Sequence, residues 1–427
     1  MRVGVVSLHY PPEPNFLVGE MVDELVSRGH EVRVLTGFPH YPKGRTYPGY
    51  QQRWRERTTK GRLTVLRTPV YPSHDASPLR RIATYTSFAV SSLPAGLHYL
   101  LDVDVIYVWH PPPTTFAAPA LAHLLRHVPV LLHVQDLWPE AVTESGMSPE
   151  GWRGRAVHRL LDSGVRRLYR SADAIVAISP SMRDLVIRRG ATPEKVEVVL
   201  NWTEESTFRP KPPTLAARTA IGHRGRCTVM YAGNIGPFQR VEVAVRAAAA
   251  AAARMDLVVV GSGIDEDRVR RLAQDLDATN VRFLGRLAPE RMADLYAGAE
   301  YQVVTLRKLE SFAGIVPSKI QSAMACGSPV IVSADGDAAQ LVDTAQAGLT
   351  CPAEDWKALA DRFLAAADLP EAERQLMARR ARDAYLERMS RAVGVGRIET
   401  ILHRISAARS DRRRQALGRD RRRADRR

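Results

Sequence analysis

Short apolar runs alternate with helix-like segments along most of this chain, and the alternating pattern occurs twice. A strand followed by a helix and another strand predicts a parallel sheet covered by helices. The first series ends at Leu200 and the second begins at Cys227. The residues between them, 201–213, are polar and contain prolines, which is typical of a linker. The sequence therefore predicts an α/β protein of two doubly wound, Rossmann-like domains.

The length supports this division, because 427 residues exceed what one hydrophobic core usually organises. We expect an N-terminal domain over 1–203 and a C-terminal domain over 204–385. A helix over 386–408 would pack back on the N-terminal domain, and a tail would cover 409–427. Ligands of doubly wound sheets bind beyond the carboxyl ends of the strands, so we expect a ligand cleft between the two sheets. The expected strands are 3–8, 31–36, 63–70, 103–109, 129–133, 174–178, 197–200, 227–232, 257–260, 281–284, 301–306 and 330–333.

The net charge is +15, and the tail contributes much of it. Residues 409–427 hold ten arginines and three aspartates, a net charge of +7. Such a block is usually a solvated, disordered tail, which is the interpretation favoured here. Attraction to an anionic membrane surface is the alternative, at about 1 kcal/mol per basic residue near the surface. Nucleic acid is not an expected partner, because the tail carries no interleaved aromatic residues.

Cysteine usage and the first residues both favour a cytoplasmic protein. The three cysteines, Cys227, Cys326 and Cys351, are far apart and build neither a metal-binding spacing nor a disulfide framework. Residues Met1–Ser7 read as a strand rather than a signal peptide. The sequence also lacks a Walker lysine-serine motif, a metal-ligand cluster and a nucleophile elbow. These features argue against a P-loop ATPase, a zinc enzyme and an α/β-hydrolase, and no metal ligand is expected.

The segment from Val316 to Val330 predicts a loop, a short helix and a buried strand. Ser318 is expected to cap the helix and Gly327 to end it. The free amides and positive dipole of the helix N-terminus would then lie beside the Lys319 ammonium. This combination predicts a binding site for an anion.

A glycine-containing turn follows the first strand of the C-terminal half. Gly233 and Gly236, on either side of Asn234, let the backbone approach a ligand closely. The next helix adds its own N-terminus. Two helix N-termini and two cations, Arg240 and Lys319, suit a diphosphate.

Two more glycine turns follow strands of the same half, Gly261-Ser262-Gly263 and Gly285-Arg286. Either is suited to flank a nucleotide base or ribose. A plain tight turn explains each equally well. Both are kept as candidate ligand contacts, because strand ends in this architecture face the ligand.

In the N-terminal half, polar residues follow strands that are expected to face the cleft. Asp136 and Glu140 come after a buried strand, and Asp136 is either a group that faces the ligand or a helix N-cap. His9 and His110 also stand at strand ends. A lone histidine there is more often structural than a ligand contact, so both interpretations stay open.

The segment from Ser77 to Leu101 is apolar but carries Arg80 and Arg81 and is interrupted at Pro94. It is too polar and too broken to span a bilayer. An amphipathic helix lying in the membrane interface is one interpretation. A pair of helices packed on the first sheet is the other, and the sequence favours neither.

Six motifs, in order along residues 1–400, resemble those of the family-four glycosyltransferases, which have the GT-B fold. The resemblance is greatest to the bacterial branch that builds O-antigen, capsule and exopolysaccharide and includes fucosamine transferases. Each motif alone is modestly specific, but six in register are highly specific. The motifs are Tyr10-Pro11-Pro12-Glu13, Arg28-Gly29-His30-Glu31-Val32, Thr36-Gly37-Phe38-Pro39-His40-Tyr41-Pro42, Asp136-Leu137-Trp138-Pro139-Glu140, Gly233-Asn234-Ile235-Gly236 and Val316-Pro317-Ser318-Lys319-Ile320-Gln321-Ser322.

The resemblance implies a metal-independent transferase without a tightly bound cofactor that retains anomeric configuration. The donor would be a nucleotide-diphosphate sugar, expected to be a UDP-sugar, bound to the C-terminal domain. The acceptor would be a polyprenyl-diphosphate-linked or other glycan that enters from the N-terminal domain. The protein would be cytoplasmic and would touch the inner face of the plasma membrane through Ser77–Leu101 and the basic tail.

The resemblance and the expected diphosphate site together assign catalytic roles to Asp136, Arg240 and Lys319. Fixed cations and amides would stabilise the charge that develops on the leaving diphosphate. The residues expected to bind the nucleotide sugar are Gly233, Asn234, Gly236, Gly261, Gly285, Arg286, Glu310, Ser318, Lys319, Gln321 and Asp337.

The chain departs from the wider family at two places. The positions of its Glu-x7-Glu pair fall at Gly314 and Ser322, so Glu310 and Asp337 are the candidate carboxylates. Its usual catalytic-histidine position falls near Gln135. Two alternatives therefore remain: a catalytically silent subunit that binds a nucleotide sugar, and a sugar-nucleotide epimerase, which shares the fold.

Overall fold

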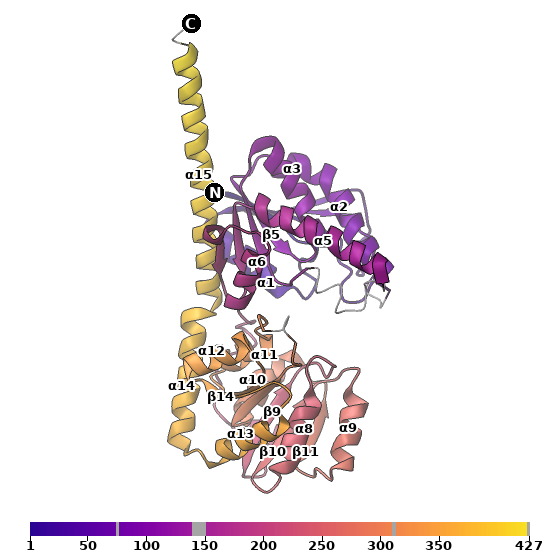
Figure 1. The fold of residues 1–427 in the computed structure, drawn as a ribbon, viewed down its shortest axis with the longest axis vertical. Helices are drawn as coiled ribbons and strands as arrows, with labels where there is room; N and C mark the ends of the chain where they lie inside the picture. The colour runs from indigo at the N-terminus through magenta and orange to yellow at the C-terminus, as the bar shows by residue number, and fades with distance from the viewer. Residues whose placement is uncertain (74–76, 139–150, 310–312, 425–427) are drawn as a thin grey trace. The chain divides into compact units, whose positions relative to one another are not determined.

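The computed structural model describes residues 1–73, 77–138, 151–309 and 313–424 (Figure 1). The chain forms two compact units. Unit 1 comprises Met1–Ile178, Met182–Val199 and Val395–Arg427, and unit 2 comprises Ser179–Ser181 and Leu200–Gly394. Each unit has one sheet, and the sheets are built from separate halves of the chain.

The sheet of unit 1 has the strand order β3-β4-β2-β1-β5-β6-β7-β8. Its neighbouring strands are parallel except β3, which is antiparallel to β4. The chain leaves β1 towards β2 on one side and returns to β5 on the other, which makes the β1/β5 boundary a topological switch point. The strands are β1 (Arg2–Val6), β2 (Glu31–Gly37), β3 (Glu56–Lys60), β4 (Leu63–Thr68), β5 (Val105–His110), β6 (Val130–Val134), β7 (Ala174–Ala177) and β8 (Val196–Val198).

Helices cover this sheet and enclose a core of aliphatic and aromatic side chains. The helices α2, α3 and α5 lie side by side in Figure 1 and together line one groove. The α-helices of unit 1 are α1 (Phe16–Ser27), α2 (Pro78–Leu100), α3 (Ala117–Arg126), α5 (Gly151–Ser171), α6 (Pro180–Arg188) and α15 (Arg391–Ala424), joined by the short 3-10 helices η1 (Pro113–Phe116) and η2 (Pro193–Lys195).

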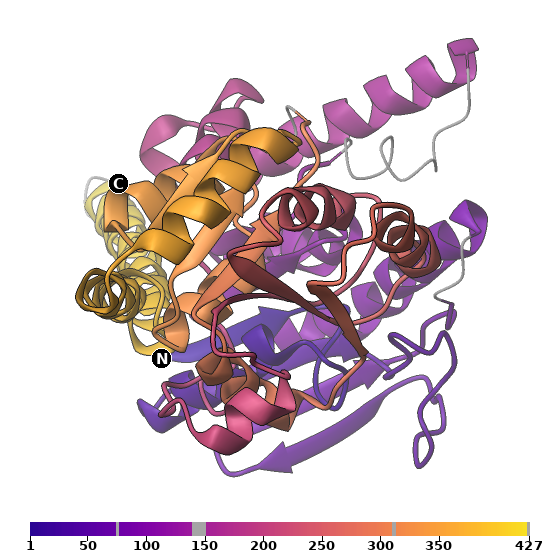
Figure 2. The same ribbon diagram turned by 90° about the horizontal axis from the view of Figure 1, so that it is seen from below.

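The sheet of unit 2 is parallel throughout, in the order β11-β10-β9-β12-β13-β14. Helices surround its strands (Figure 2). The strands are β9 (Cys227–Ala232), β10 (Met255–Val260), β11 (Val281–Gly285), β12 (Tyr301–Thr305), β13 (Val330–Ser333) and β14 (Gly348–Cys351). The helices are α7 (Leu215–Ala220), α8 (Val241–Ala250), α9 (Glu266–Asp275), η3 (Pro289–Arg291), α10 (Met292–Gly298), α11 (Ser318–Ala325), α12 (Asp337–Ala345), α13 (Trp356–Asp368) and α14 (Glu371–Arg388).

The prediction that Pro94 breaks the Ser77–Leu101 segment is wrong, because α2 is one helix from Pro78 to Leu100 with Pro94 inside it. Packing explains the continuity. Phe88 and Leu100 are fully buried, and a Cβ on Gly96 would meet the Leu35 side chain, so the helix lies very close to the sheet. The burial of this face offsets the backbone hydrogen bond that proline cannot make.

The C-terminal residues also differ from the prediction of a disordered tail, because α15 continues to Ala424. Its first part is fixed to unit 1: Glu399 accepts hydrogen bonds from Arg28 at 2.7 Å and pairs with His30 at 2.6 Å. Farther along, Arg409 donates to the Val103 carbonyl at 3.0 Å. Among the described residues, no helix combines the length and hydropathy needed to cross a bilayer.

Candidate active site

A cavity of about 890 Å³ lies in unit 2 beyond the carboxyl ends of four neighbouring strands, β11, β10, β9 and β12. This is the edge where doubly wound sheets bind ligands. Every residue that lines it belongs to unit 2. The lining residues are Phe208, Ala232, Gly233, Asn234, Phe238, Gln239, Val260, Gly261, Ser262, Arg286, Leu287, Pro289, Met292, Tyr296, Val304, Thr305, Leu306, Ile315, Pro317, Ser318, Lys319 and Ser322.

Two glycines at the ends of β9 and β10 shape the floor of the cavity. Gly261 has φ +138°, and a Cβ there would overlap the carbonyl oxygen of Gly233. Gly233 has φ +137°, and a Cβ on it would collide with Lys319, at 3.1 Å from Nζ. Only glycine tolerates these conformations and this crowding. The two turns therefore lie against each other and leave room for the lysine.

Lys319 reaches this floor from the first turn of α11. Its ammonium donates to the Tyr231 hydroxyl and lies 4.1 Å from the centre of the Tyr231 ring. No described carboxylate forms an ion pair with it within 4 Å. Desolvation by burial lowers its pKa from 10.5 to about 7. A cation that is desolvated without a carboxylate partner is poised to bind an anion.

The prediction that Ser318 caps this helix is wrong. Pro317 occupies the N-cap, with φ −62° and ψ 141°, and Ser318 is the first helical residue. The proline ring restricts φ and keeps the chain extended until that point. The Ser318 side chain is exposed and lines the cavity, beside the first amides of α11, which have no partner within the helix.

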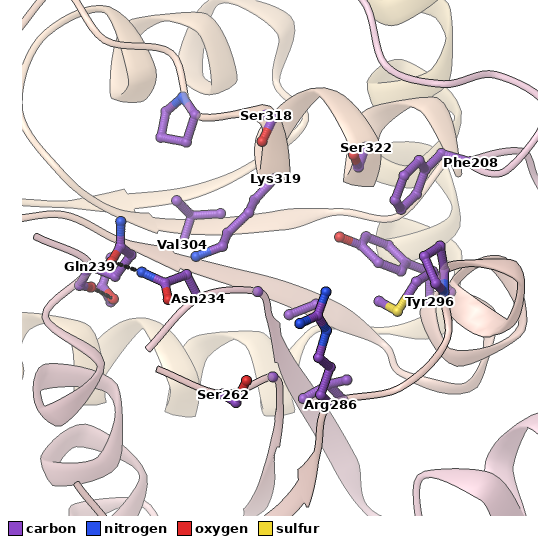
Figure 3. A pocket seen from close by; sticks show the side chains of 18 of the residues that line it. Phe208, Asn234, Gln239, Ser262, Arg286, Tyr296, Val304, Ser318, Lys319 and Ser322 are labelled. Atoms are coloured by element: carbon purple, nitrogen blue, oxygen red, sulfur yellow. Dashed lines mark hydrogen bonds between the residues drawn. The ribbon is translucent and has the colours of Figure 1, made fainter. Parts of the chain in front are cut away.

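The side chains around Lys319 differ in character on its two sides (Figure 3). Asn234 and Gln239 lie on one side, where the Asn234 amide donates to the Gln239 side chain at 3.2 Å. Phe208, Tyr296 and Arg286 lie on the other side. The Phe208 and Tyr296 rings meet edge to face, with centres 5.8 Å apart. The cavity thus offers a cation and polar groups next to an aromatic wall, which suits a phosphate joined to a flat base.

Six residues that the sequence predicted as contacts line this cavity: Gly233, Asn234, Gly261, Arg286, Ser318 and Lys319. Three others lie nearby without lining it. Gly236 is buried in its turn, Gly285 ends β11 with φ +67°, and Gln321 is buried in α11. Glu310 lies outside the described residues.

Arg240 and Asp337 are placed elsewhere in unit 2. Arg240 precedes α8 and forms ion pairs with Glu242 at 2.9 Å and Glu354 at 2.7 Å. Asp337 is buried at the start of α12, where its two oxygens accept from the backbone amide and the hydroxyl of Ser181, each at 2.8 Å. Neither side chain lines the cavity.

Asp136 belongs to unit 1, two residues beyond the end of β6. Part of its surface is open to solvent, yet the protein atoms around it raise the pKa of its carboxyl by desolvation. The neighbouring His133 is fully enclosed, bonds the Tyr107 hydroxyl at 2.6 Å and has a pKa lowered to about 3 by burial. Glu140 lies outside the described residues.

Several lining residues escaped the sequence analysis. Gln239 lines the cavity, and Tyr231 accepts from the Lys319 ammonium without lining it. Both flank the glycine turn, and their place in that motif was a usable signal. Phe208 comes from the predicted linker, and Tyr296 from α10. Nothing in the local pattern marks these two, because they reach the cavity through tertiary packing.

Comparison with known proteins places each half of the chain. Residues 15–202 match the family described as glycosyl transferase 4-like domain, and residues 226–368 match glycosyl transferases group 1. A protein of Escherichia coli strain K12 named as a colanic acid biosynthesis glycosyl transferase, WcaI, is 29% identical over 358 residues, covering 81% of this chain and 86% of its own.

Solved structures share the fold at low sequence identity. Sucrose-phosphate synthase from Thermosynechococcus elongatus superposes with a TM-score of 0.69 at 19% identity, covering 96% of this chain and all of its own. Anabaena HepE, solved in complex with UDP, has a TM-score of 0.68 at 15% identity and covers 94% of this chain and all of its own. Both halves of the chain match glycosyltransferase families, and its fold has two parallel-sheet domains of the GT-B type. The chain therefore belongs to the family-four glycosyltransferases.

Proposed function

We propose that this protein transfers a sugar from a UDP-sugar to a polyprenyl-diphosphate-linked glycan in cell-surface polysaccharide synthesis, with retention of configuration and without a metal ion. The observation that carries the proposal is Lys319, a cation at the N-terminus of α11 inside the cavity that forms no ion pair with any described carboxylate. The UDP complexes of HepE, a protein of the same fold, support the choice of nucleotide.

The cavity suggests how the donor would bind. The diphosphate would lie against Lys319, Ser318 and the first amides of α11, and the base beside Arg286 and the aromatic wall. When the bond between the sugar and the diphosphate breaks, negative charge grows on the departing phosphate. The ammonium and the helix amides would stabilise that charge without reorganising, which is the largest effect such a site can supply.

Arg240 would contribute to this charge only from a distance, because Glu242 and Glu354 already pair with it. In unit 1, Asp136 would serve the acceptor side, where its raised pKa suits a group that exchanges a proton. The positions of the family's acidic pair are occupied by Gly314 and by Ser322, whose hydroxyl bonds Thr203 at 2.9 Å.

The test is release of UDP. Purified protein is incubated with a panel of UDP-sugars and polyprenyl-diphosphate-linked glycans extracted from bacterial membranes, and both UDP and glycosylated lipid are measured. At least one donor should give UDP and labelled lipid in equal amounts. UDP binding without turnover would identify a silent binding subunit, and donor conversion without any lipid would identify an epimerase; either result would reject the transferase proposal.

We also propose that α2 and its neighbours contact the membrane surface. Leu79, Ile82 and Val90 follow each other at helical spacing on one stripe of α2 and are exposed, at 78%, 47% and 66%. Leu124 on α3 and Leu160 on α5 are also exposed, at 72% and 75%, on helices that line one groove with α2. Clustered exposed apolar side chains of this kind mark interaction surfaces.

Binding to vesicles should depend on this stripe. Replacing Leu79, Ile82 and Val90 together by serine should weaken binding to phosphatidylglycerol-containing vesicles at least about tenfold, because each side chain that enters the interface contributes on the order of 1 kcal/mol. Sedimentation with vesicles at two salt concentrations is the measurement. Leu215→Ser, which changes a leucine with 82% exposure in unit 2, is the control. Equal binding of the triple variant and the control would reject this surface.

A further inference from the structure

Four histidines stand at the carboxyl edge of the sheet of unit 1, on four neighbouring strands. His9 follows β1, His40 follows β2, His110 ends β5, and His133 lies in β6. The switch point between β1 and β5 lies among them. This edge belongs to the unit that does not contain the donor cavity.

His9 is held more tightly than a surface histidine needs to be. Its carbonyl accepts from the Ser7 hydroxyl at 2.7 Å and from the Asn15 amide at 3.1 Å. Its ring packs against Tyr41, with centres 5.0 Å apart, and its Nδ1 lies 3.2 Å from a Glu13 oxygen. With Nδ1 so engaged, Nε2 has no hydrogen-bond partner among the described residues, and the side chain is 26% exposed.

Glu13 is the centre of this arrangement. Its fully buried carboxylate accepts from His9 and from the backbone amides of Tyr10, His40 and Tyr41, at 3.1, 2.9 and 2.7 Å for the amides. Burial alone would raise its pKa, but the hydrogen bonds from His9 and the two later amides outweigh burial and hold the pKa below its usual value. The carboxylate therefore joins the loop after β1 to the loop after β2.

The same three side chains, His9, Glu13 and His40, lie close enough to suggest a metal site. The hydrogen bonds argue against one. The Glu13 oxygen nearest both histidines, Oε1, already accepts from three donors: His9 Nδ1 and the amides of His40 and Tyr41. No lone pair of that oxygen is left for a metal. His40 Nδ1, which is 3.7 Å from Glu13, lies 2.9 Å from the Phe38 carbonyl and must carry a proton there, so this ring nitrogen offers no lone pair to a metal beside Glu13. The cluster is a hydrogen-bond clamp.

A clamp of this kind selects one tautomer of His9. Glu13 accepts a hydrogen bond from the Nδ1–H group, and this tautomer has its lone pair on the accessible Nε2. A hydroxyl group of a ligand is the natural donor to such an atom. On the other side of the switch point, His110 is fully buried, and neither of its ring nitrogens has a hydrogen-bond partner among the described residues. Buried polar atoms without partners indicate water or a ligand at this edge.

We propose that His9 Nε2 accepts a hydrogen bond from a hydroxyl of the sugar acceptor, and that Glu13 is the positioning residue that orients His9 for this contact. The inference rests on the proposed transfer function and adds the residues that recognise the acceptor. It assigns Glu13 no contact with the substrate.

The experiment separates acceptor binding from donor binding. The amount of extracted polyprenyl-diphosphate-linked glycan that half-saturates transfer is measured for the wild type and for His9→Ala, His9→Gln and Glu13→Gln, and UDP affinity is measured by calorimetry for each. His9→Ala should raise the half-saturating amount about tenfold, the loss of one good hydrogen bond, with UDP affinity unchanged. His9→Gln, whose side-chain oxygen can accept near the position of Nε2, should recover part of the loss.

Glu13→Gln should act in the same direction as His9→Ala, and adding it to His9→Ala should cost little more, because both changes disable one contact. Matched controls are His98→Ala and Asp23→Asn, which change an exposed histidine and an exposed carboxylate of unit 1. Should Glu13→Gln fail to fold, the partly exposed His9 variants still decide the matter.

Unchanged half-saturation in His9→Ala, in a preparation whose wild type transfers sugar, would overturn this inference and leave the transferase function standing. A loss of UDP affinity equal to the loss of acceptor affinity would also overturn it, since it would indicate a general structural role. If the wild type releases no UDP with any donor and acceptor, the proposed function itself fails, and that result is distinct from both.

Discussion

Replacing Lys319 by alanine should weaken UDP binding by roughly 10- to 100-fold, the loss expected for a hydrogen-bonded charge on a phosphate. The loss in kcat/KM for the preferred UDP-sugar should be about 10²- to 10³-fold, because the ammonium would stabilise the charge that develops on the diphosphate as its bond to the sugar breaks. Calorimetric titration with UDP and steady-state UDP release measure the two effects.

The same variant should not be less stable than the wild type at neutral or lower pH. The folded-state pKa of Lys319 lies near 7, below its usual 10.5, so between these values the unfolded chain binds more protons and stability rises with pH. Below about pH 7 the partly buried ammonium is charged in the folded state and lowers stability. Replacing the side chain by alanine removes this destabilisation. Thermal melts of the wild type and the variant without ligand at pH 6 show whether the variant is at least as stable.

The lowered pKa also predicts how binding depends on pH. In the protein without ligand, Lys319 loses its proton above about pH 7, so UDP affinity should fall as the pH rises from 7 to 9. Lys319→Arg keeps its charge at every such pH and should flatten this dependence. The control is Lys357→Ala, which removes an exposed lysine on α13. Equal UDP affinity in the wild type and Lys319→Ala would contradict the assignment of Lys319 to the diphosphate.

Replacing Gly261 by alanine should damage both the stability of unit 2 and UDP binding. Its φ of +138° is strained for alanine, and the new Cβ would overlap the Gly233 carbonyl oxygen, which cannot move without shifting the floor of the cavity. We expect a loss of about 2–3 kcal/mol, a fall in melting temperature of about 4–10 °C and a loss of UDP affinity of at least about tenfold.

Gly285→Ala is the matched control for this substitution. Gly285 ends the next strand with a φ of +67°, and a Cβ on it would meet no atom within 4 Å. Its cost should be the conformational penalty alone, about 1–2 kcal/mol, with UDP affinity retained. If the two variants lost UDP affinity equally, the close approach of Gly233 and Gly261 would not be what shapes the site. Differential scanning calorimetry and UDP titration together distinguish these outcomes.

The twelve strands that the apolar runs predicted all occur, because a parallel strand buried on both faces leaves a clear apolar signal. Two strands lack that signal. The strand β3, Glu56–Lys60, lies at the edge of its sheet with mostly exposed polar residues, and β14, Gly348–Cys351, is short and half-buried. The alanine-rich run over 241–253 predicts a helix, and α8 ends within it at Ala250, because its composition gives no boundary signal.

The sequence predicted the site residues whose type and position, at a strand end or a helix start, both indicate a ligand contact. Glycines at strand ends and a lysine in the first turn of a helix are visible in the sequence, and the structure brings Gly233, Gly261 and Lys319 together. Side-chain partners were not predictable. The pairing of Arg240 with Glu354 joins residues far apart in the chain, and only the packed structure decides whether such a cation meets a carboxylate or a ligand.

The attachment of α15 has a consequence for how this protein is made. The residues from Val395 onward belong to the unit whose strands are translated first, and Glu399 meets Arg28 and His30 near the opposite end of the chain. While the ribosome is still synthesising unit 2, the first domain lacks its closing helix and must wait until residues 395 onward emerge. Unit 1, whose strands are translated before those of unit 2, is therefore completed after unit 2.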